Sequence, residues 1–457
     1  MAFNTALSGL QAAAASLNVT GNNIANASTT GFKASVAEFG DVYANSVLGG
    51  GSNSIGNGVA LADVEQNFAQ GNLSFTSNAL DLAINGNGFF IVSSQGQQLY
   101  TRNGAFGVDN TGNLVDNSGA VLQGFPASAS GAISGQLANL RVVTDNLPPI
   151  QTTDVNGLLN LDSREVPPSV TPFDPTDQNT YNHATSISIF DSQGNDHVMT
   201  KFFVKNQANP AAVPPVPENQ WTMYIQIDGR DVGRPGATVG PPTTGGTAPS
   251  ATTTPTRQSF TVNFTEDGAL SSTVPATMVI DGWVPVDANG NYNGTELPGA
   301  DDALPTTPPT TSNFTIDLSG TTQFGSVFAV NDINQNGFAT GLLTGVDIAG
   351  TGGVFARYTN GQSRLLGQVG LANFSNVEGL SPQGSTQWAE TFDSGNPVVG
   401  TPGSASLGVL QSGALEESNV DLSAELVSLI LAQRNYQANA RAIETESAVT
   451  QAILQIR

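Results

Sequence analysis

Both ends of this chain carry apolar residues at alternating three- and four-residue steps, the spacing that aligns side chains along one seam of a helix. The N-terminal stripe consists of Phe3, Leu7, Leu10, Ala14, Leu17 and Ile24, with Gly21 in the remaining place. No charged residue occurs in residues 1–32, although a helix that faces water normally carries charges on its outer side. The sequence therefore predicts a helix with neighbours on several sides, ending near Asn26, where Asn, Ser, Thr and Gly cluster.

The C-terminal stripe has the same spacing and consists of Leu422, Leu426, Leu429, Gln433, Tyr436, Ala440 and Ile443. Ser418 and Asp421 have the spacing of a capping box, which marks the start of a helix. Glu416, Glu417 and Glu425 are expected to add negative charge near the positive end of that helix. The pattern alone leaves two interpretations open. The helices pack on a globular core of their own chain, or they form contacts between copies.

Between the stripes the periodicity changes to two, which is typical of strands with one buried face. Turn sequences such as Asn87-Gly88 and Asn103-Gly104 interrupt the strand-like residues 81–125. Residues 185–190 and 198–204 flank another turn sequence, DSQGND. These signals predict antiparallel hairpins. Stretches rich in proline, threonine and glycine are expected to be long surface loops, at 209–217, 235–255 and 298–312.

If the two termini pair, the chain runs outward and returns, so its inner domains each combine an early and a late piece. The predicted fold class is α+β and multi-domain, with paired, coiled-coil-like terminal helices enclosing nested, mainly antiparallel β domains. The predicted parts are a terminal helical domain, an extended connecting segment, an inner β domain and an outer β domain. Their ranges are 1–30 with 425–457, 31–75 with 409–424, 76–149 with 326–408, and 150–325.

Composition excludes several classes of protein. Lys and Arg number 14 against 37 Asp and Glu, a formal net charge of −23, so binding to a nucleic-acid backbone is not expected. The chain has no cysteine, which excludes disulfides, thiolate metal sites and cysteine nucleophiles. The first basic residue is Lys33, so the basic start of a secretory signal is missing. The longest apolar stretch near the C-terminus, residues 426–432, is far shorter than a membrane span requires. We therefore expect neither a cleaved secretory signal nor a membrane span.

The polar motifs do not predict a catalytic, cofactor or metal site. His183 and His197 flank DSQGND without a helical partner, so they are expected to be surface strand residues. The loop that begins at Asp287 resembles a calcium loop but lacks the required glycine and glutamate. Gly86-Asn87-Gly88 leads into a strand, so it cannot present a helix end to a phosphate. We expect no cofactor. A secreted acidic carbohydrate-active enzyme with paired carboxylates and an adhesin remain alternatives of other classes.

The residues themselves are more informative than their spacing. LNVTGNNIANASTTGFKASVAEF (17–39) resembles the N-terminal signature of the bacterial flagellar rod and hook family of axial proteins, and SNVDLSAELVSLILAQRNYQANARAIETE (418–446) closely resembles its C-terminal signature. DLAINGNGFFIV, YTRNGAFGVDNTGNLVDNSGAVLQGF and LGQVGLANFSNVEGL are similar to inner β pieces of the hook and distal-rod branch. The matching signature positions are Asn22, Asn23, Ile24, Ala25, Asn26, Gly31, Phe32, Lys33, Asn419, Asp421, Leu422, Gln433, Arg434, Tyr436, Gln437 and Asn439.

Within this branch, the long insertion between the inner β pieces favours a hook subunit, with a distal rod-type subunit as the alternative. The resemblance implies a structural, non-enzymatic subunit of a tubular helical polymer, which acts as a flexible coupling and transmits torque from rod to filament. It also implies an assembly interface on the terminal helices. The predicted interface residues are Leu7, Leu10, Ala14, Leu17, Ile24, Leu422, Leu426, Leu429, Tyr436, Ala440 and Ile443.

The partners that the resemblance implies are further copies of this chain, rod proteins, a hook-cap protein, hook-filament junction proteins and the flagellar type III export apparatus. Neither nucleic acid nor membrane insertion is expected. The implied location is extracellular, in the hook of the flagellum, after export without a cleaved signal peptide. Phe39 and Tyr43 match an aromatic export signal of this family.

Overall fold

The computed structural model describes residues 2–42, 56–128, 131–143, 145–212, 216–232, 257–280, 283, 285 and 313–455. The chain forms two compact units. The first unit consists of Met1–Asp145, Leu343–Tyr358 and Gln362–Arg457, and the second of Asn146–Leu342 with Thr359–Gly361. The first unit therefore combines early and late parts of the chain around a long insertion. The finer four-part division stays a prediction.

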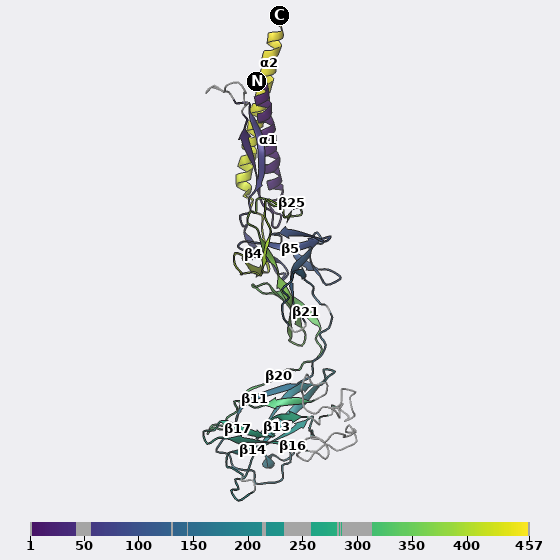
Figure 1. The fold of residues 1–457 in the computed structure, drawn as a ribbon, viewed down its shortest axis with the longest axis vertical. Helices are drawn as coiled ribbons and strands as arrows, with labels where there is room; N and C mark the ends of the chain where they lie inside the picture. The colour runs from purple at the N-terminus through teal and green to yellow at the C-terminus, as the bar shows by residue number, and fades with distance from the viewer. Residues whose placement is uncertain are drawn as a thin grey trace. The chain divides into compact units, whose positions relative to one another are not determined.

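Two helices form one end of the first unit. Helices α1 (Ala2–Ala25) and α2 (Leu422–Gln455) lie side by side and run in opposite directions, so both chain termini lie at the same end of the pair (Figure 1). The terminal helices predicted from the stripes are thus confirmed. Helix α1 ends one residue before Asn26, and the chain then turns away through Gly31, which has a φ of +69°.

Helix α2 begins differently from the prediction. The Asp421 carboxylate accepts hydrogen bonds from the amides of Ser423 (2.9 Å) and Ala424 (3.2 Å), so Asp421 is itself the N-cap. The hydroxyl of Ser418 accepts from the Val420 amide (3.3 Å) outside the helix. The predicted capping box is wrong because an aspartate at this place satisfies the first free amides of the helix alone.

Short antiparallel pairs connect the helices to the body of the first unit. In each of two pairs, one strand comes from the early part of the chain and one from the late part. The pairs are β1 (Ser35–Asp41) with β2 (Val59–Gln66), β3 (Leu73–Phe75) with β29 (Ala414–Glu416), and β4 (Leu82–Asn85) with β28 (Val409–Ser412). The β3–β29 and β4–β28 ladders join the outgoing and returning chain, whereas β1 and β2 both come from its early part.

The body of the first unit is a 13-stranded antiparallel sheet with β21-β22-β23-β9-β5-β6-β26-β25 as its main path. Its strands are β5 (Phe89–Ser94), β6 (Gln97–Thr101), β7 (Phe106–Val108), β8 (Leu114–Asp116), β9 (Val121–Pro126), β10 (Ala138–Asn139), β21 (Leu343–Ile348), β22 (Gly353–Tyr358), β23 (Ser363–Val369), β24 (Leu371–Asn373), β25 (Ser381–Gly384), β26 (Gln387–Ala389) and β27 (Val398–Gly400). One core cluster contains Phe90, Leu122 and Val369, and another contains Phe89, Tyr100 and Trp388. The predicted antiparallel hairpins are confirmed.

The second unit contains two sheets. The four-stranded sheet has the order β18-β19-β11-β20, and the six-stranded sheet has the order β12-β13-β14-β16-β17 with β15 beside β14. Their strands are β11 (Asp154–Asn160), β12 (His183–Phe190), β13 (Asp196–Lys205), β14 (Gln220–Ile227), β15 (Arg230–Asp231), β16 (Gln258–Phe264), β17 (Leu270–Val274), β18 (Met278–Ile280), β19 (Phe314–Asp317) and β20 (Ala329–Gln335), with a short 3-10 helix, η1 (Gln178–Thr180). Strands β11 and β19 are parallel; the other pairs are antiparallel.

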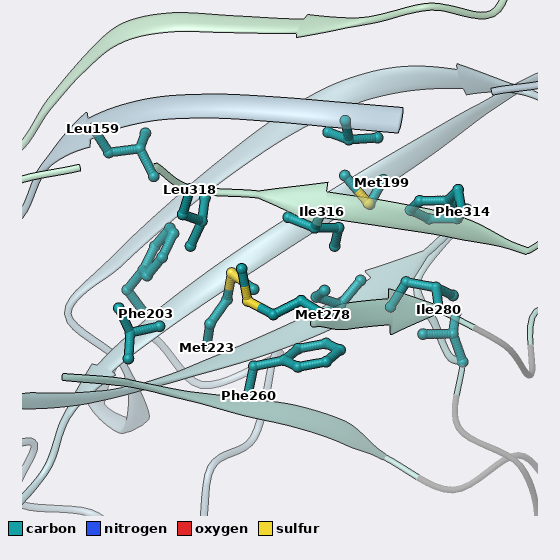
Figure 2. Close-up of a cluster of buried hydrophobic side chains, with 14 of the residues drawn as sticks. Leu159, Met199, Phe203, Met223, Phe260, Met278, Ile280, Phe314, Ile316 and Leu318 are labelled. Atoms are coloured by element: carbon teal, nitrogen blue, oxygen red, sulfur yellow. The ribbon is translucent and has the colours of Figure 1, made fainter. Parts of the chain in front are cut away.

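The core of the second unit lies between these sheets. Figure 2 shows side chains of both sheets meeting there, among them Met199, Phe203 and Ile316. Lys201 also points inward from β13, because it lies two residues from both Met199 and Phe203 and so on the same face of the strand. Its side chain is completely buried. Within the described residues, its Nζ has no hydrogen-bond partner. Burial lowers the pKa of Lys201 to about 8.

The two histidines do not lie on the surface as predicted. His197 is buried, with Nδ1 2.6 Å from Asp228 Oδ2 and Nε2 3.3 Å from Asp191 Oδ2. His183 is half-buried and stacks on Phe328 at 4.4 Å between ring centroids. His197 can be buried because acidic partners at both ring nitrogens replace its contacts with water.

Several sequence predictions concern other segments. The loops 235–255 and 298–312, the loop that begins at Asp287, and Tyr43 lie outside the described residues. Among the helices that the structure describes, neither is long and apolar enough to cross a membrane.

Candidate assembly site

Small and polar side chains form the contact between the two helices. The best-buried residues of α1 are Ala13, Thr20 and Asn23, and Ala432 is the one fully buried residue in the described part of α2. A Cβ atom added to Gly9 would lie 2.7 Å from the Asn439 side chain, so the helices approach closely there. The helices therefore pair without burying most of their large apolar side chains.

Many of the larger apolar side chains of both helices point outward. Large apolar residues at least 37% exposed are Phe3, Leu7, Leu422, Leu426, Val427, Ile430, Leu431, Tyr436 and Val449. An apolar surface of this extent on paired helices is unusual for a chain that functions alone. The helical pair thus presents apolar side chains that its own chain leaves uncovered.

The predicted interface residues divide between these two surroundings. The more exposed ones are Leu7, Leu422, Leu426 and Tyr436. The half-buried ones are Leu10, Ala14, Leu17, Ile24, Leu429, Ala440 and Ile443. Gln433, Arg434 and Gln437 are exposed on α2. The assembly role of these positions stays a prediction.

At the lower end of α1, Asn23 joins three parts of the chain. Its Nδ2 donates to the Ser35 carbonyl (2.7 Å) and to Glu425 Oε1 of α2 (2.8 Å), and its Oδ1 accepts from the Ser35 amide (2.9 Å). Asn23 is buried. One amide side chain therefore fixes the start of β1 and the first turn of α2 against the end of α1.

Asn419 has a similar role on the returning chain. Its Oδ1 accepts from the Ala34 amide (2.8 Å), and its Nδ2 donates to the carbonyls of Asn67 (2.7 Å) and Ala69 (3.0 Å). An amide can donate and accept at once, which a carboxylate at this place could not do. Asn419 therefore ties the segment before α2 to both sides of the β1–β2 hairpin.

A buried ionic cluster lies beside these two asparagines. Glu416 Oε1 is 2.5 Å from Lys33 Nζ, and Glu416 Oε2 is 3.1 Å from an Arg102 guanidinium nitrogen. Lys33 also donates to the Ala69 carbonyl (2.8 Å), and the Gly71 amide donates to Glu416 Oε1 (3.0 Å). Burial lowers the pKa of both Lys33 and Arg102, and the Glu416 carboxylate opposes that shift.

We call Asn23, Lys33, Arg102, Glu416 and Asn419 the junction cluster. Gly31 lies next to it and donates its amide to the Glu416 carbonyl (2.8 Å). A Cβ atom on Gly31 would lie 2.6 Å from the Asn103 amide nitrogen, so only glycine fits there without movement. The junction cluster holds the two helices to the sheet of the first unit.

Sequence reasoning located three members of this cluster as signature positions and missed two. Glu416 was expected to favour the start of α2 through its charge, but it lies in β29 and pairs with Lys33 and Arg102. Arg102 was not singled out. A signal was present, since Arg102 and Glu416 are charged residues in strand-like segments and buried charges need partners.

The cluster offers no evident chemistry beyond structure. Among the described residues, no group of three or more His, Cys, Asp and Glu side chains could hold a metal ion. Of the other signature residues, Asn22 and Ala25 are exposed, and Phe32 and Asn26 are half-buried. The arrangement is therefore suited to holding segments together and to presenting apolar helices.

Comparison with family profiles covers most of the chain. Residues 3–33 match the family described as flagella basal body rod protein, and 83–156 match the flagellar hook protein FlgE/F/G D1 domain. Residues 160–338 match the flagellar basal body protein FlaE D2 domain, and 411–456 match the C-terminal family of basal body rod FlgEFG proteins. The order of these matches follows the fold: a terminal helix, an inner sheet, an inserted unit and the returning helix.

Relatives match over the whole length. The flagellar hook protein FlgE of Salmonella typhimurium is 37% identical over 464 residues, covering 100% of both chains, and that of Escherichia coli is 37% identical over 463 residues with the same coverage. The hook protein FlgE of Rhizobium meliloti is 31% identical, covering 100% of this chain and 98% of its own.

A solved structure supports the fold. The crystal structure of the Helicobacter pylori flagellar hook protein FlgE2 aligns with a TM-score of 0.50 at 13% identity, covering 75% of this chain and 100% of that one. The carbohydrate-active enzyme and adhesin alternatives do not fit these relatives. The chain belongs to the flagellar hook protein FlgE family, whose members are structural subunits of the flagellum and not enzymes.

Proposed function

We propose that this chain polymerises through α1 and α2 into the tubular wall of the hook. The observation that carries the proposal is the outward apolar surface of the helical pair, which includes Leu426, Ile430 and Leu431. Burying each such side chain contributes about 1.5–3 kcal/mol, so several of them favour association strongly. The absence of charge in residues 1–32 supports the same contact, because a crowded helix bundle excludes unpaired charges.

Polymerisation would also stabilise the helices themselves. Within one chain, the best-buried apolar residues of the two helices are Ala13 and Ala432, which are small and bury little apolar area. A long helix that buries so little is marginal in water. We therefore propose that the terminal helices are largely unfolded in the monomer and become ordered as neighbouring copies cover Leu422, Leu426 and Tyr436.

The junction cluster suits a subunit that transmits torque. Asn23 and Asn419 hold the helices to β1 and β2, and the buried Glu416 holds them to the sheet through Lys33 and Arg102. A load applied to the helices would pass directly into the first unit. The inserted second unit would supply the outer contacts that change as the tube bends, which makes the polymer a flexible coupling.

We also propose the finer partners and location that the resemblance implies. The polymer would join rod proteins to hook-filament junction proteins, grow beneath a hook-cap protein, and lie outside the cell after type III export without cleavage. Phe39 of the possible export signal is 40% exposed on β1, which leaves it accessible. The four-part domain division and the listed helical interface positions belong to the same proposal.

Truncation and point variants test the proposal. Removing residues 1–30 or 425–457 should leave a soluble protein with a folded second unit that forms no tubes in negative-stain electron microscopy. The pair Leu426→Ser and Ile430→Ser should also prevent tubes. Val166→Ser, which changes a residue 71% exposed in the second unit, is the control and should assemble normally. Tubes formed by either truncated chain would refute the proposal.

A further inference from the structure

The two ends of the helical pair are held unequally. We call one end the junction end: it comprises the last turn of α1 and the first turn of α2, beside the junction cluster. The opposite, terminal end contains both chain termini (Figure 1). At the junction end Asn23 is buried and donates to Glu425 (2.8 Å), whereas Phe3 and Val449 at the terminal end are exposed.

Much of the junction cluster does not depend on the helices. Lys33, Arg102 and Glu416 lie outside α1 and α2, and their buried ion pairs join separate segments of the first unit. Asn419 also precedes α2, and its side chain accepts from the Ala34 amide (2.8 Å). This part of the cluster can therefore close while the helices are still unfolded.

The junction end also contains turns from which the helices can grow. The Asp421 carboxylate caps the first turn of α2 by accepting from the amides of Ser423 and Ala424. At the end of α1, the Asn26 side chain donates to the Asn22 carbonyl (3.0 Å). Forming the first turn is the costly step of helix formation, because it fixes several residues for one hydrogen bond. A turn that is held by contacts outside the helix avoids part of this cost.

The register set at the junction end is also the register needed further along the pair. Asn23 of α1 meets Glu425 of α2. Gly9 of α1 meets Asn439 of α2, whose side chain would lie 2.7 Å from a Cβ atom added to Gly9. The same number of residues separates Gly9 from Asn23 as separates Glu425 from Asn439. Because both helices rise equally per residue, the first contact brings the second into place.

We propose that the junction cluster is a template for the terminal helices. In the unassembled chain it holds the last turn of α1 and the first turn of α2 in helical form, and both helices lengthen from there as neighbouring copies cover them. The inference rests on the proposed function, in which most of α1 and α2 becomes ordered only on assembly. Turns that are ordered beforehand leave less chain to order when a neighbour binds, which strengthens association.

Hydrogen exchange of the unassembled, full-length chain tests the template, with mass spectrometry of peptides as the readout. Residues 20–25 and 422–428 at the junction end should exchange roughly tenfold or more slowly than residues 3–10 and 440–450 toward the terminal end. Strand β13, in the core of the second unit, provides the internal reference and should exchange alike in every variant.

Two variants and a control assign the effect to the junction end. Asn23→Ala should abolish most of the difference, because it removes the bonds to Ser35 and Glu425. Asn22→Ala is the matched control, since Asn22 is adjacent and exposed and its carbonyl remains, and it should keep the difference. Gly9→Ala introduces a clash only where the helices are paired. It should leave the unassembled junction end protected and raise the critical concentration for assembly.

The outcomes separate the template from the proposed function. Fast exchange along both helices of the parent, junction end included, would overturn the inference alone. So would a junction end that stays equally protected in Asn23→Ala or loses its protection in Gly9→Ala. Slow exchange along the full length of both helices before assembly would overturn the inference together with the proposed ordering on assembly. A protected junction end in a chain that forms no tubes would overturn the proposed polymerisation and not the template.

Discussion

Lys33 Nζ lies 2.5 Å from Glu416 Oε1, although 383 positions separate the two residues in the sequence and both side chains are fully buried. Arg102 adds a second cation on the other carboxylate oxygen. Two cations facing one carboxylate leave an uncompensated positive charge, which the nearby carbonyls of Ala69 and Gly86 partly offset by accepting hydrogen bonds. The stability of the junction therefore depends on the single carboxylate.

Replacing Glu416 by Gln should destabilise the first unit strongly. The amide keeps the shape of the side chain but leaves Lys33 and Arg102 buried without an anion, which typically costs about 3–5 kcal/mol. Urea unfolding followed by circular dichroism measures the effect. Arg357→Met is the control, because Arg357 pairs with Asp347 at the surface, where 68% and 42% of the two side chains are exposed, and it should leave the transition unchanged. Similar transitions for the two variants would contradict the structural role of the cluster.

The two junction asparagines should protect different amides. Asn23→Ala removes the acceptor of the Ser35 amide, and Asn419→Ala removes the acceptor of the Ala34 amide. Because an unpaired buried amide costs about 1–3 kcal/mol, each variant should speed hydrogen exchange at its own amide by roughly fivefold to a hundredfold. Each variant also serves as the control for the other. Equal acceleration of both amides in either variant would show that the whole junction opens as one piece.

Glycine is required at Gly31 and should be replaceable at Gly21. Alanine at Gly31 would bring its Cβ within 2.6 Å of the Asn103 amide nitrogen at a φ of +69°, so Gly31→Ala should lower the melting temperature. Gly21 lies within α1 with nothing within 4 Å of its added Cβ. Gly21→Ala should therefore raise helix stability by about 0.5–1 kcal/mol. Thermal melts of assembled tubes, in which the helices are ordered, followed at 222 nm compare the two, and a stable Gly31→Ala variant would be inconsistent with this packing.

Lys201 should make the second unit more stable as the pH rises from about 8 to 10.5. In the unfolded chain a lysine keeps its proton to pH 10.5, whereas burial lowers the folded pKa to about 8. Between these values the unfolded chain binds more protons, so the free energy of unfolding increases with pH. Below pH 8 the amine is charged in both states, and because only the folded state buries it, the folded state carries a penalty of about 3 kcal/mol.

Lys201→Met tests this assignment. The variant replaces the amine by an apolar group of similar length, so it should be more stable than the parent at pH 7 and lose most of the rise above pH 8. Tryptophan fluorescence can follow urea unfolding, because Trp221 and Trp283 both lie in the core of the second unit. The difference between parent and variant isolates Lys201 from other lysines. A difference that stays constant from pH 7 to 10.5 would contradict the burial of a charged amine.

The terminal helices and the β centre could be predicted from the sequence because their periodicities differ. The face that each helix turns toward the other helix could not be predicted. Periodicity identifies the apolar stripe, and the stripe at Leu422 and Leu426 proved to be exposed, whereas the helices meet at Gly9 with Asn439 and at Asn23 with Glu425. A stripe shows which face prefers to leave water. It does not show whether the covering surface belongs to the same chain.

The junction cluster was partly accessible to sequence reasoning. Asn23, Lys33 and Asn419 stood out through resemblance, but their partners depend on three-dimensional pairing of distant segments. His197 was predicted to lie on the surface and Lys201 was overlooked, because both are polar. Both lie at every-second positions of β13 that point inward, so their side chains are buried. Glu416 was assigned to the wrong neighbour because its nearest element in sequence is α2 and its partners lie in early segments.

The ladders that pair β3 with β29 and β4 with β28 set the order in which the newly made chain can fold. Strands β3 and β4 have no partner until β29 and β28 have been synthesised, and Lys33 has no counter-ion until residue 416 exists. A ribosome therefore cannot release a finished first unit before it has nearly completed the protein. The early segments that form the junction stay unpaired until the last tenth of the chain has been made. Each copy can therefore complete its junction only as a full-length molecule.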